Sequence, residues 1–411
     1  MTHDFGEAYV RLVLGVGCHD PDYVDAYYGP AAWRAEVTTA AWGLADLEAR
    51  AAALAADLDG LSPSPGADDL PALRYAYLRS QLSALRARVS MLQGRRLRFD
   101  EESRALYDAV APTHDEGYFE AALVALGEAL PGTGSLPERY EAYRSRFIIP
   151  ASRLDAVFTA AIGASRERTR AHVALPPNER FTVEYVTDRS WSGYNWYQGD
   201  YQSLIQVNTD LPIHVDRAVD LACHEGYPGH HVYNVLLEHH LVRGRGWVEF
   251  TVYPLFSPQS LIAEGTANAG IDVAFPRAER LAFEQAVVFP AAGLDPGEAA
   301  RYYDVLGLME RLSYAGNEAA RRYLDGVCDA EQATRWLERY GLYAPARAAQ
   351  RLRFVDQYRS YVINYNLGKD LVLAHLRAGG GTDADPDRRW RVFADLISSP
   401  RVPATLAAPS C

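Results

Sequence analysis

The feature that most constrains the fold is a helical repeat of apolar residues in the first half of the chain. Residues 44–59 and 72–96 are rich in Ala, Leu and Arg, and their apolar side chains recur every three or four positions. This spacing places them on one face of an α-helix, and these three residue types are among the best helix formers. The sequence therefore predicts long amphipathic helices that pack on a shared core.

The same pattern predicts helices along most of the chain. They are expected at 100–112, 118–130, 136–147, 151–174, 259–273, 277–290, 297–323, 330–341, 343–377 and 386–397. Helices far outnumber strands in this prediction, so the expected fold class is mainly α, with two lobes.

The pattern changes between residues 176 and 210. Residues 181–186 (FTVEYV) and 203–209 (SLIQVNT) alternate apolar and polar side chains and are rich in β-branched and aromatic types, which is typical of strands. We therefore predict one small β-sheet or hairpin in a helical protein. The expected division is a helical lobe at 1–175 and a second region at 176–411 that holds the sheet. A single structural unit is the alternative.

Composition and charge exclude several classes of protein. The chain has 411 residues, 48% of them hydrophobic, and a formal net charge of −12 without a long Lys/Arg run, so nucleic acid is not an expected partner. No stretch approaches about 18 apolar residues, so no membrane span is expected. Four cysteines without paired spacing favour a reducing compartment. The start of the chain lacks the basic region of a signal peptide, and the expected location is the cytoplasm of a bacterium. No pattern indicates the oligomeric state.

One segment carries residues suited to metal chemistry. His224-Glu225 is followed by His230-His231 within the sequence HEGYPGHH. Neutral imidazoles are good ligands for Zn²⁺, and a catalytic zinc keeps three protein ligands and an open position. A carboxylate next to the first histidine can take a proton from water. The segment therefore resembles the metal helix of a zinc hydrolase.

The spacing of these histidines requires an irregular helix. On a regular helix His224 and His230 would point about 120° apart, and His231 would lie about 10.5 Å from His224 along the axis. Pro228 has no N–H to donate to the preceding turn, and Gly229 tolerates almost any backbone conformation. A bulge there would bring His230 to the second ligand position. We favour His230 as that ligand, and His231 is the alternative.

A third ligand is expected downstream of the histidines. Glu264 lies in an apolar helical segment, where an unpaired carboxylate would be costly. Asn268, one turn later, and Asp220, one turn before His224, are candidates for orienting a ligand imidazole. The resulting prediction is a zinc site made by His224, His230 and Glu264.

These motifs resemble those of a bacterial family of domains of unknown function. Its members carry His-Glu-x-x-Pro-Gly-His-His followed by Glu-Gly, and they are regarded as metallopeptidases. HEGYPGHH and the later Glu264-Gly265 match this pattern, while Thr266 stands where the family usually has Trp. The family is distantly similar to carboxypeptidase Taq, the oligopeptidases and angiotensin-converting enzyme, which are gluzincin-like. The resemblance implies a two-lobed helical metallopeptidase with a deep cleft and a small sheet beside its metal helix.

The resemblance also implies roles for residues outside the metal segment. In such peptidases an edge strand before the metal helix binds the substrate backbone, and residues 203–209 stand in that place. A tyrosine near the C-terminus stabilises the oxyanion. The segment 358–368 resembles the corresponding helix of carboxypeptidase Taq and indicates Tyr361 as this donor, with Tyr365 as the alternative.

The sequence thus predicts a zinc-dependent peptidase that acts on short peptides. Glu225 is the expected general base, and the zinc and a tyrosine are expected to stabilise the oxyanion. Three alternatives stay open. The site could hydrolyse a small non-peptide amide or ester, the chain could be an inactive peptide-binding relative, or the His-Glu cluster could be a polar network without metal.

Overall fold

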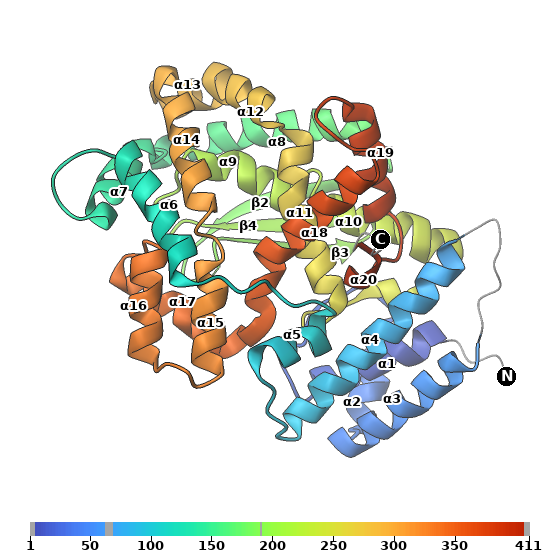
Figure 1. Ribbon diagram of the computed structural model, residues 1–411. Helices are drawn as coiled ribbons and strands as arrows, with labels where there is room; N and C mark the ends of the chain where they lie inside the picture. The colour runs from blue at the N-terminus through green and yellow to red at the C-terminus, as the bar shows by residue number, and fades with distance from the viewer. Residues whose placement is uncertain (1–4, 62–68, 190, 407–411) are drawn as a thin grey trace.

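The chain folds into a mainly helical structure with one three-stranded sheet (Figure 1), as the sequence predicts. The computed structural model describes residues 5–61, 69–189 and 191–406. Its helices are α1 (Phe5–Gly17), α2 (Ala31–Ala40), α3 (Leu44–Asp59), α4 (Leu70–Leu92), α5 (Phe99–Tyr107), α6 (Glu116–Ala129), α7 (Leu136–Arg144), α8 (Leu154–His172), α9 (Asp216–Leu221), α10 (His230–Leu237), α11 (Pro258–Ala274), α12 (Arg277–Phe283), α13 (Phe289–Ala292), α14 (Ala299–Glu310), α15 (Ala315–Leu324), α16 (Ala330–Tyr340), α17 (Pro345–Tyr358), α18 (Ile363–Ala378), α19 (Pro386–Ile397) and α20 (Pro403–Leu406).

Most predicted helices are present, and the longest predictions are interrupted. The span 44–59 coincides with α3, whereas 343–377 is divided into α17 and α18. The interruption lies at Arg359, whose positive φ of 52° is incompatible with a continuous right-handed helix. The span 297–323 is likewise divided into α14 and α15. Helices α1 and α2 were not predicted.

The three-stranded sheet contains one strand more than the sequence predicts. Strands β2 (Arg180–Val186) and β4 (Gln202–Asn208) match the predicted segments and run parallel to each other. The connection between them forms β3 (Gly193–Gly199), which pairs antiparallel with β4, so the strand order is β2-β4-β3. Because β4 is paired on both sides, the expectation that 203–209 is an edge strand is wrong. The edge strands of this sheet are β2 and β3.

A second, two-stranded sheet joins distant parts of the chain. Strand β1 (Val24–Tyr27) pairs antiparallel with β5 (Val252–Pro254). Val24 lies opposite Pro254 and Ala26 lies opposite Tyr253, so Asp25 is an extra residue in β1. This β-bulge turns the Asp25 side chain out of the regular alternation of the strand.

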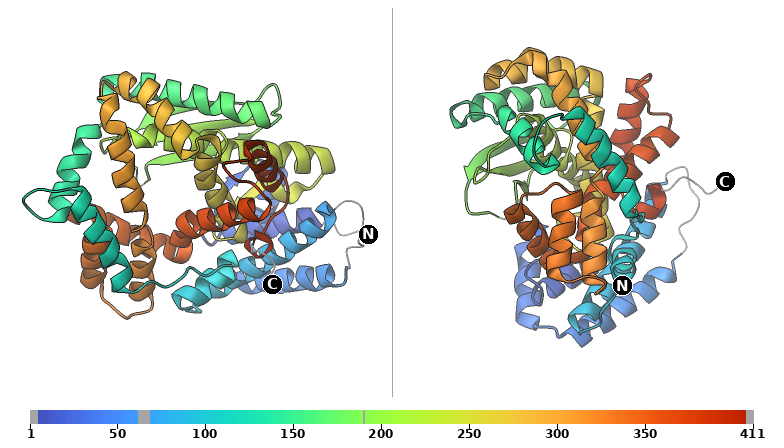
Figure 2. Two further views of the ribbon diagram at one scale, coloured as in Figure 1. Left: turned by 45° about the horizontal axis from the view of Figure 1, so that its top comes forward. Right: turned by 60° about the vertical axis from the view of Figure 1, so that its left-hand side comes forward.

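Helix α11 lies at the centre of the core. Fourteen of its 17 residues are buried, and it packs most extensively against α18. Helices α4, α5, α8 and α10 also contact α11, so segments from the whole chain meet on it. The views in Figure 2 show α1–α4 on one side of the molecule and α8 with α12–α14 on the opposite side. The sheet and α10 lie beside α11 (Figure 1).

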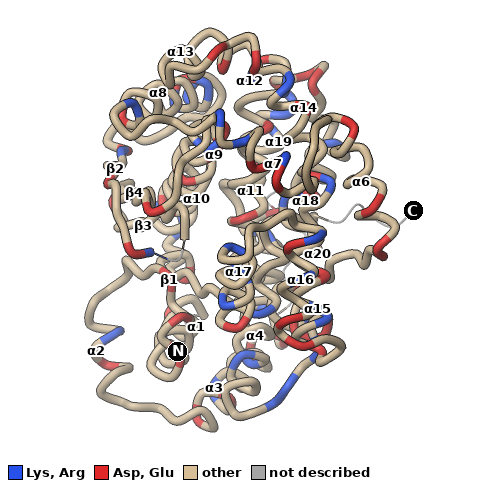
Figure 3. The backbone as a smooth tube through the Cα atoms, turned by 90° about the vertical axis from the view of Figure 1, so that its left-hand side faces the viewer, with Lys and Arg blue, Asp and Glu red and all other residues tan. Residues whose placement is uncertain are grey.

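Charged residues of both signs are intermixed along the backbone (Figure 3). Among the described helices, none combines the length and the apolar character that a bilayer crossing needs.

Candidate metal centre

The metal segment is an interrupted helix, as Pro228 and Gly229 predict. Helix α9 ends in a wide π-helical turn at Ala222–Gly226, and α10 begins at His230. The N–H of Gly229 donates to the carbonyl of Cys223 (2.9 Å). A Cβ atom at position 229 would lie 2.0 Å from the carbonyl oxygen of His224, so no other residue fits this backbone. The interruption therefore brings His230 back toward His224.

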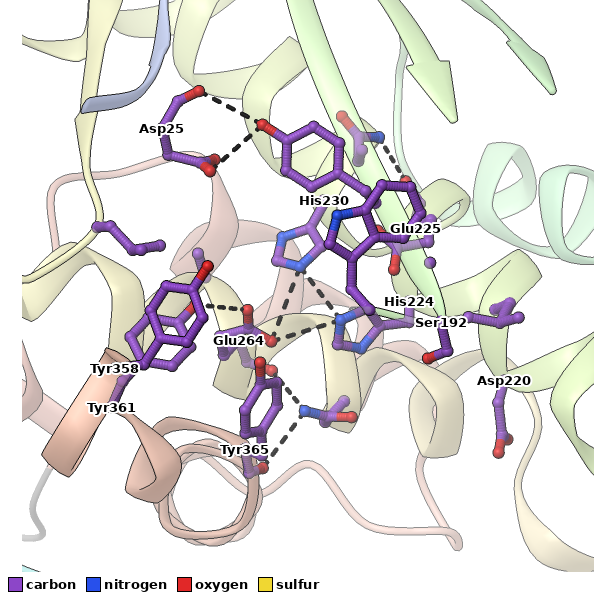
Figure 4. Close-up of a pocket in the computed structure, with 18 of the residues that line it drawn as sticks. Asp25, Ser192, Asp220, His224, Glu225, His230, Glu264, Tyr358, Tyr361 and Tyr365 are labelled. Atoms are coloured by element: carbon purple, nitrogen blue, oxygen red, sulfur yellow. Dashed lines mark hydrogen bonds and ion pairs between the residues drawn. The ribbon is translucent and has the colours of Figure 1, made fainter. Parts of the chain in front are cut away.

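The structure brings together the three predicted ligands, His224, His230 and Glu264 (Figure 4). The Nε2 atoms of the two histidines are 3.2 Å apart. Oε2 of Glu264, on α11, lies 3.4 Å from Nε2 of His224 and 3.9 Å from Nε2 of His230. Three potential ligand atoms from two separate segments thus converge on one point.

The donor atoms and their spacing fit a zinc ion. Oε2 of Glu264 is buried and accepts no hydrogen bond, whereas Oε1 accepts one from the Tyr361 hydroxyl (2.8 Å). Ligands about 2.0–2.1 Å from a tetrahedral zinc are separated by about 3.3 Å, close to the two shorter distances observed. A buried carboxylate oxygen without a partner is costly unless a cation or donor binds it. His224, His230 and Glu264 are therefore able to hold Zn²⁺.

The pKa shifts of two of the three ligands, His230 and Glu264, agree with this donor set. Burial and the neighbouring His224 lower the pKa of His230 to about 4, so its imidazole is neutral at pH 7. Burial alone would raise the pKa of Glu264, but the two imidazoles and Tyr361 outweigh it and lower that pKa. A neutral imidazole and an ionised carboxylate are the forms that bind zinc. Burial lowers the pKa of His224, but its pairing with Glu264 and the charge of Glu225 outweigh burial and raise that pKa, so a metal competes with a proton for this imidazole.

Glu225 lies next to the three ligands and faces the same cavity. Burial raises the pKa of Glu225 to about 7, with His224 lowering it and Glu264 raising it. Strand β3 passes directly beside the carboxylate, because a Cβ on Gly193 would lie 2.8 Å from its Oε1. Asn195 on the same strand donates from Nδ2 to the Glu225 carbonyl (2.7 Å). The edge strand is thus fixed against the candidate base.

A close helix crossing positions Glu264 against α18. A Cβ on Gly265 would lie 2.6 Å from backbone atoms of Gly368, so the two backbones touch at this point. The contact explains why glycine follows the ligand glutamate. The amide Nδ2 of Asn268 donates to the carbonyls of Glu264 (3.0 Å) and Tyr365 (3.3 Å) and links the two helices. These contacts use only the Nδ2 of Asn268, so the expectation that Asn268 orients a ligand imidazole stays a prediction.

The two candidate tyrosines differ in how their hydroxyls are used. Tyr361 is buried, and its hydroxyl is the donor to Glu264 Oε1. Tyr365 is half-buried and lines the same cavity (Figure 4). Within the described residues, no hydrogen-bond partner of the Tyr365 hydroxyl is found. The Tyr365 hydroxyl is therefore free to bind a ligand in the cavity.

His231 belongs to a separate cluster behind the candidate metal centre. Its Nδ1 lies 2.8 Å from the Ser203 hydroxyl and its Nε2 lies 3.1 Å from Glu179. The same carboxylate accepts hydrogen bonds from Tyr227 (2.6 Å) and Arg166 (2.8 Å). Both ring nitrogens of His231 are engaged and its side chain is fully buried, so His231 neither joins the three ligands nor faces the cavity.

Asp220 is also held by partners other than histidine. Its carboxylate forms ion pairs with Arg280 (2.8 Å) and Arg217 (3.5 Å). The structure therefore gives Asp220 the arginines of α9 and α12 as partners, and the expectation that it orients His224 is wrong.

The cavity in front of the ligands has a volume of about 510 Å³ and contains charged residues that the sequence did not indicate. Asp25 and Tyr194 enter it from β1 and β3, and Arg217, Arg347 and Arg351 enter it from α9 and α17. Arg347 and Arg351 share a helix face, since they are four residues apart, but nothing in the sequence places this face at the cavity. Asp25 carries no local signal because only the fold brings it near the histidines.

The fold resembles that of other proteins of known structure at low sequence identity. A candidate lipoprotein from Colwellia psychrerythraea is 15% identical over 92% of this chain and 72% of its own, with a TM-score of 0.52. A candidate lipoprotein of unknown function from Shewanella oneidensis is 13% identical over 95% of this chain and 82% of its own, with a TM-score of 0.44. An M32 carboxypeptidase from Deinococcus radiodurans R1 is 16% identical over 96% of this chain and 88% of its own, with a TM-score of 0.38. The sequence matches no protein-family model and no curated protein.

Proposed function

We propose that this protein is a zinc-dependent hydrolase that cleaves short peptides. The observation that carries the proposal is the convergence of His224, His230 and Glu264, with the unpartnered Glu264 Oε2 facing both imidazoles. Without a metal, the Glu264 Oε2 atom has, within the described residues, only the two imidazoles beside it, at 3.4 Å and 3.9 Å, and it accepts no hydrogen bond of good geometry. An acidic residue directly beside the ligands, Glu225, adds the base that hydrolysis needs.

The proposed reaction divides the work between the ion and the side chains. His224, His230 and Glu264 would hold Zn²⁺, which acts as a Lewis acid that lowers the pKa of water and polarises a carbonyl. Glu225 accepts a proton from the attacking water and passes it to the leaving nitrogen. A pKa near 7 suits a group that accepts and then donates a proton close to neutral pH.

We assign different roles to the two tyrosines. A hydroxyl has one proton, and that of Tyr361 is donated to Glu264 Oε1, so Tyr361 orients the ligand carboxylate. The Tyr365 hydroxyl lies in the cavity and becomes the proposed donor to the oxyanion. This reverses the preference that the sequence resemblance gave.

The surroundings of the cavity support a peptide as substrate. Strand β3 is an edge of its sheet, and its residues Gly193, Tyr194 and Asn195 line the cavity. An extended peptide can pair with such an edge through main-chain hydrogen bonds, which a small ester lacks. The cavity also contains charged groups of both signs, as the termini of a short peptide require.

A comparison of substrates tests this proposal. Protein supplied with zinc is incubated with a library of short peptides and, separately, with simple acyl amides and esters, and products are identified by mass spectrometry. We expect cleavage of peptides that stops on chelation and returns with zinc. Cleavage of the small amides or esters alone would favour the non-peptide alternative. Tight peptide binding without any cleavage would contradict the hydrolase and indicate a peptide-binding protein.

A further inference from the structure

Asp25 is an acidic side chain in the cavity that the proposed reaction does not use. It is the extra residue of the β1 bulge, and its side chain lies in the cavity from the side of β1 (Figure 4). Bulges next to active sites commonly redirect one side chain toward a ligand. The bulge therefore places a carboxylate where a regular strand would place none.

No positively charged partner neutralises Asp25 within the described residues. Its Oδ1 and its carbonyl oxygen lie 3.3 Å and 3.4 Å from the hydroxyl of Tyr194, and these are its hydrogen bonds there. Burial raises the pKa of Asp25 to about 7, which the Tyr194 hydrogen bond reduces and the charge of Glu264 increases. A cation bound beside Asp25 would favour its ionised form.

The groups around Asp25 suit a cationic ligand. Tyr194 stacks on Trp191 with ring centroids 5.6 Å apart, and Tyr253 and Tyr358 line the same cavity. The faces of such rings attract ammonium and guanidinium groups. A carboxylate among aromatic rings is thus a recognised arrangement for binding a positively charged nitrogen.

Two of the three arginines of the cavity, Arg347 and Arg351, lie away from Asp25. Tyr358, at the end of α17, lies near the start of β1, because the adjacent Gln357 donates from Nε2 to Oδ2 of Asp22 (3.1 Å). Arg351 and Arg347 precede Tyr358 on the same helix by seven and eleven residues, about 10 Å and 16 Å along the axis. The cavity is therefore acidic near β1 and basic near the start of α17.

We propose that the carboxylate of Asp25 binds a positively charged nitrogen of the substrate, either a free amino terminus or a basic side chain. This inference rests on the proposed function only in that the peptide lies in the cavity in front of His224 and His230. The arginine end of the cavity then faces the carboxylate end of the peptide, so the two charged ends set the direction in which the peptide binds.

Binding without turnover tests this proposal. The zinc-supplied Glu225→Gln protein is titrated by calorimetry with Ala-Phe and Ala-Ala-Phe, each with a free and an acetylated amino terminus, and with acetylated Lys-Ala-Phe. A charge-assisted hydrogen bond predicts about tenfold or more tighter binding of a cationic probe than of its neutral counterpart. The probe that gains affinity identifies the nitrogen. Equal affinities, or no affinity for any probe, overturn the proposal.

Variants then locate the effect. Asp25→Asn should remove the preference for the cationic probe, while Asp22→Asn, an exposed acid of the same segment outside the cavity lining, should keep it. Tyr194→Phe leaves the carboxylate and should keep most of the preference, whereas its complete loss would assign the role to the tyrosine. The comparison of free and acetylated probes stands even where a variant fails to fold. If a peptide binds with this preference and the wild-type protein with zinc never cleaves it, the proposed hydrolase activity is contradicted and the Asp25 proposal stands.

Discussion

His230 and His231 are neighbours in the sequence and belong to two different clusters. His230, with His224, Glu264 and Glu225, forms the cavity cluster, which faces an open cavity. His231 belongs to the buried cluster, whose other members are Glu179, Ser203, Tyr227 and Arg166. Both clusters combine histidine with glutamate, and they differ in how the carboxylate oxygens of the glutamate are paired.

The pairing of the carboxylate oxygens distinguishes a cluster that stabilises the fold from one that binds a ligand. In the buried cluster Glu179 accepts hydrogen bonds from three side chains, and both nitrogens of His231 are engaged. In the cavity cluster Oε2 of Glu264 is buried and accepts none. A buried carboxylate whose two oxygens are both paired stabilises a fold, while an unpaired buried carboxylate oxygen persists where a ligand or a reaction uses it. We therefore assign stability to the buried cluster and chemistry to the cavity cluster.

The largest expected effect is on the rate of peptide cleavage, and it distinguishes Glu225 from Glu179. Glu225→Gln removes the proposed base and should lower kcat about 10²–10⁴-fold, with zinc content and thermal stability close to those of the wild-type protein. Glu179→Gln, assayed at a temperature where it is folded, should retain most of the activity. Peptide cleavage rates measured beside zinc content check this pair. Undiminished turnover in Glu225→Gln would remove the general-base assignment.

The next largest effect is on the free energy of unfolding, and it again distinguishes Glu179 from Glu225. Glu179→Gln breaks charged hydrogen bonds in a buried network and should lower the free energy of unfolding by about 2–4 kcal/mol at pH 7. Burial raises the pKa of Glu179, but His231, Tyr227 and Arg166 outweigh it and lower that pKa to about 2. This folded value lies below the unfolded value of about 4.3, so the stabilisation is complete above pH 5 and is lost as the pH falls toward 2.

Denaturant unfolding at several pH values checks this dependence. The stability gap between the wild-type protein and Glu179→Gln should be widest at pH 6–8 and should narrow below about pH 4. A gap that stays constant down to pH 3 would show that the charge of Glu179 is not what stabilises the buried cluster.

The smallest expected effects divide Tyr361 from Tyr365. Tyr365→Phe removes the proposed oxyanion donor and should lower kcat by about 10–100-fold without changing zinc affinity. Tyr361→Phe removes the hydrogen bond to Glu264 Oε1 and should weaken zinc binding by about tenfold. Zinc affinity by competition with a chelator, measured beside kcat for both variants, distinguishes them. An unaltered affinity in Tyr361→Phe together with a large loss of kcat would return the oxyanion role to Tyr361.

Local features of the sequence sufficed for much of the cavity cluster. Pro228 and Gly229 predict a break in the helix, and the break selects His230 over His231 as the histidine that returns to His224. Glu264 was predicted from the cost of burying an unpaired carboxylate in an apolar helix. These inferences need only helix geometry and the residue types at neighbouring positions, so they can be made without knowledge of the tertiary fold.

Features that depend on long-range packing could not be predicted in this way. The alternation of residues 203–209 shows which side chains share a face but says nothing about strand order, and β4 proved to be a central strand. Helical spacing predicts Asp220 as a partner of His224, whereas its carboxylate forms ion pairs with the arginines of α9 and α12. Asp25 enters the cavity through a bulge paired with β5, a contact that no local pattern encodes.

The zinc content of the purified protein shows most directly whether His224, His230 and Glu264 hold a metal ion. Protein prepared without added metal is measured by mass spectrometry for metals, beside His224→Ala prepared in the same way. We expect about one zinc ion per chain in the wild-type protein and none in the variant, since three ligands are needed to hold the ion. A wild-type protein that stays free of metal even after zinc is supplied would contradict the account, because the cavity cluster would then be a polar network with no bound ion.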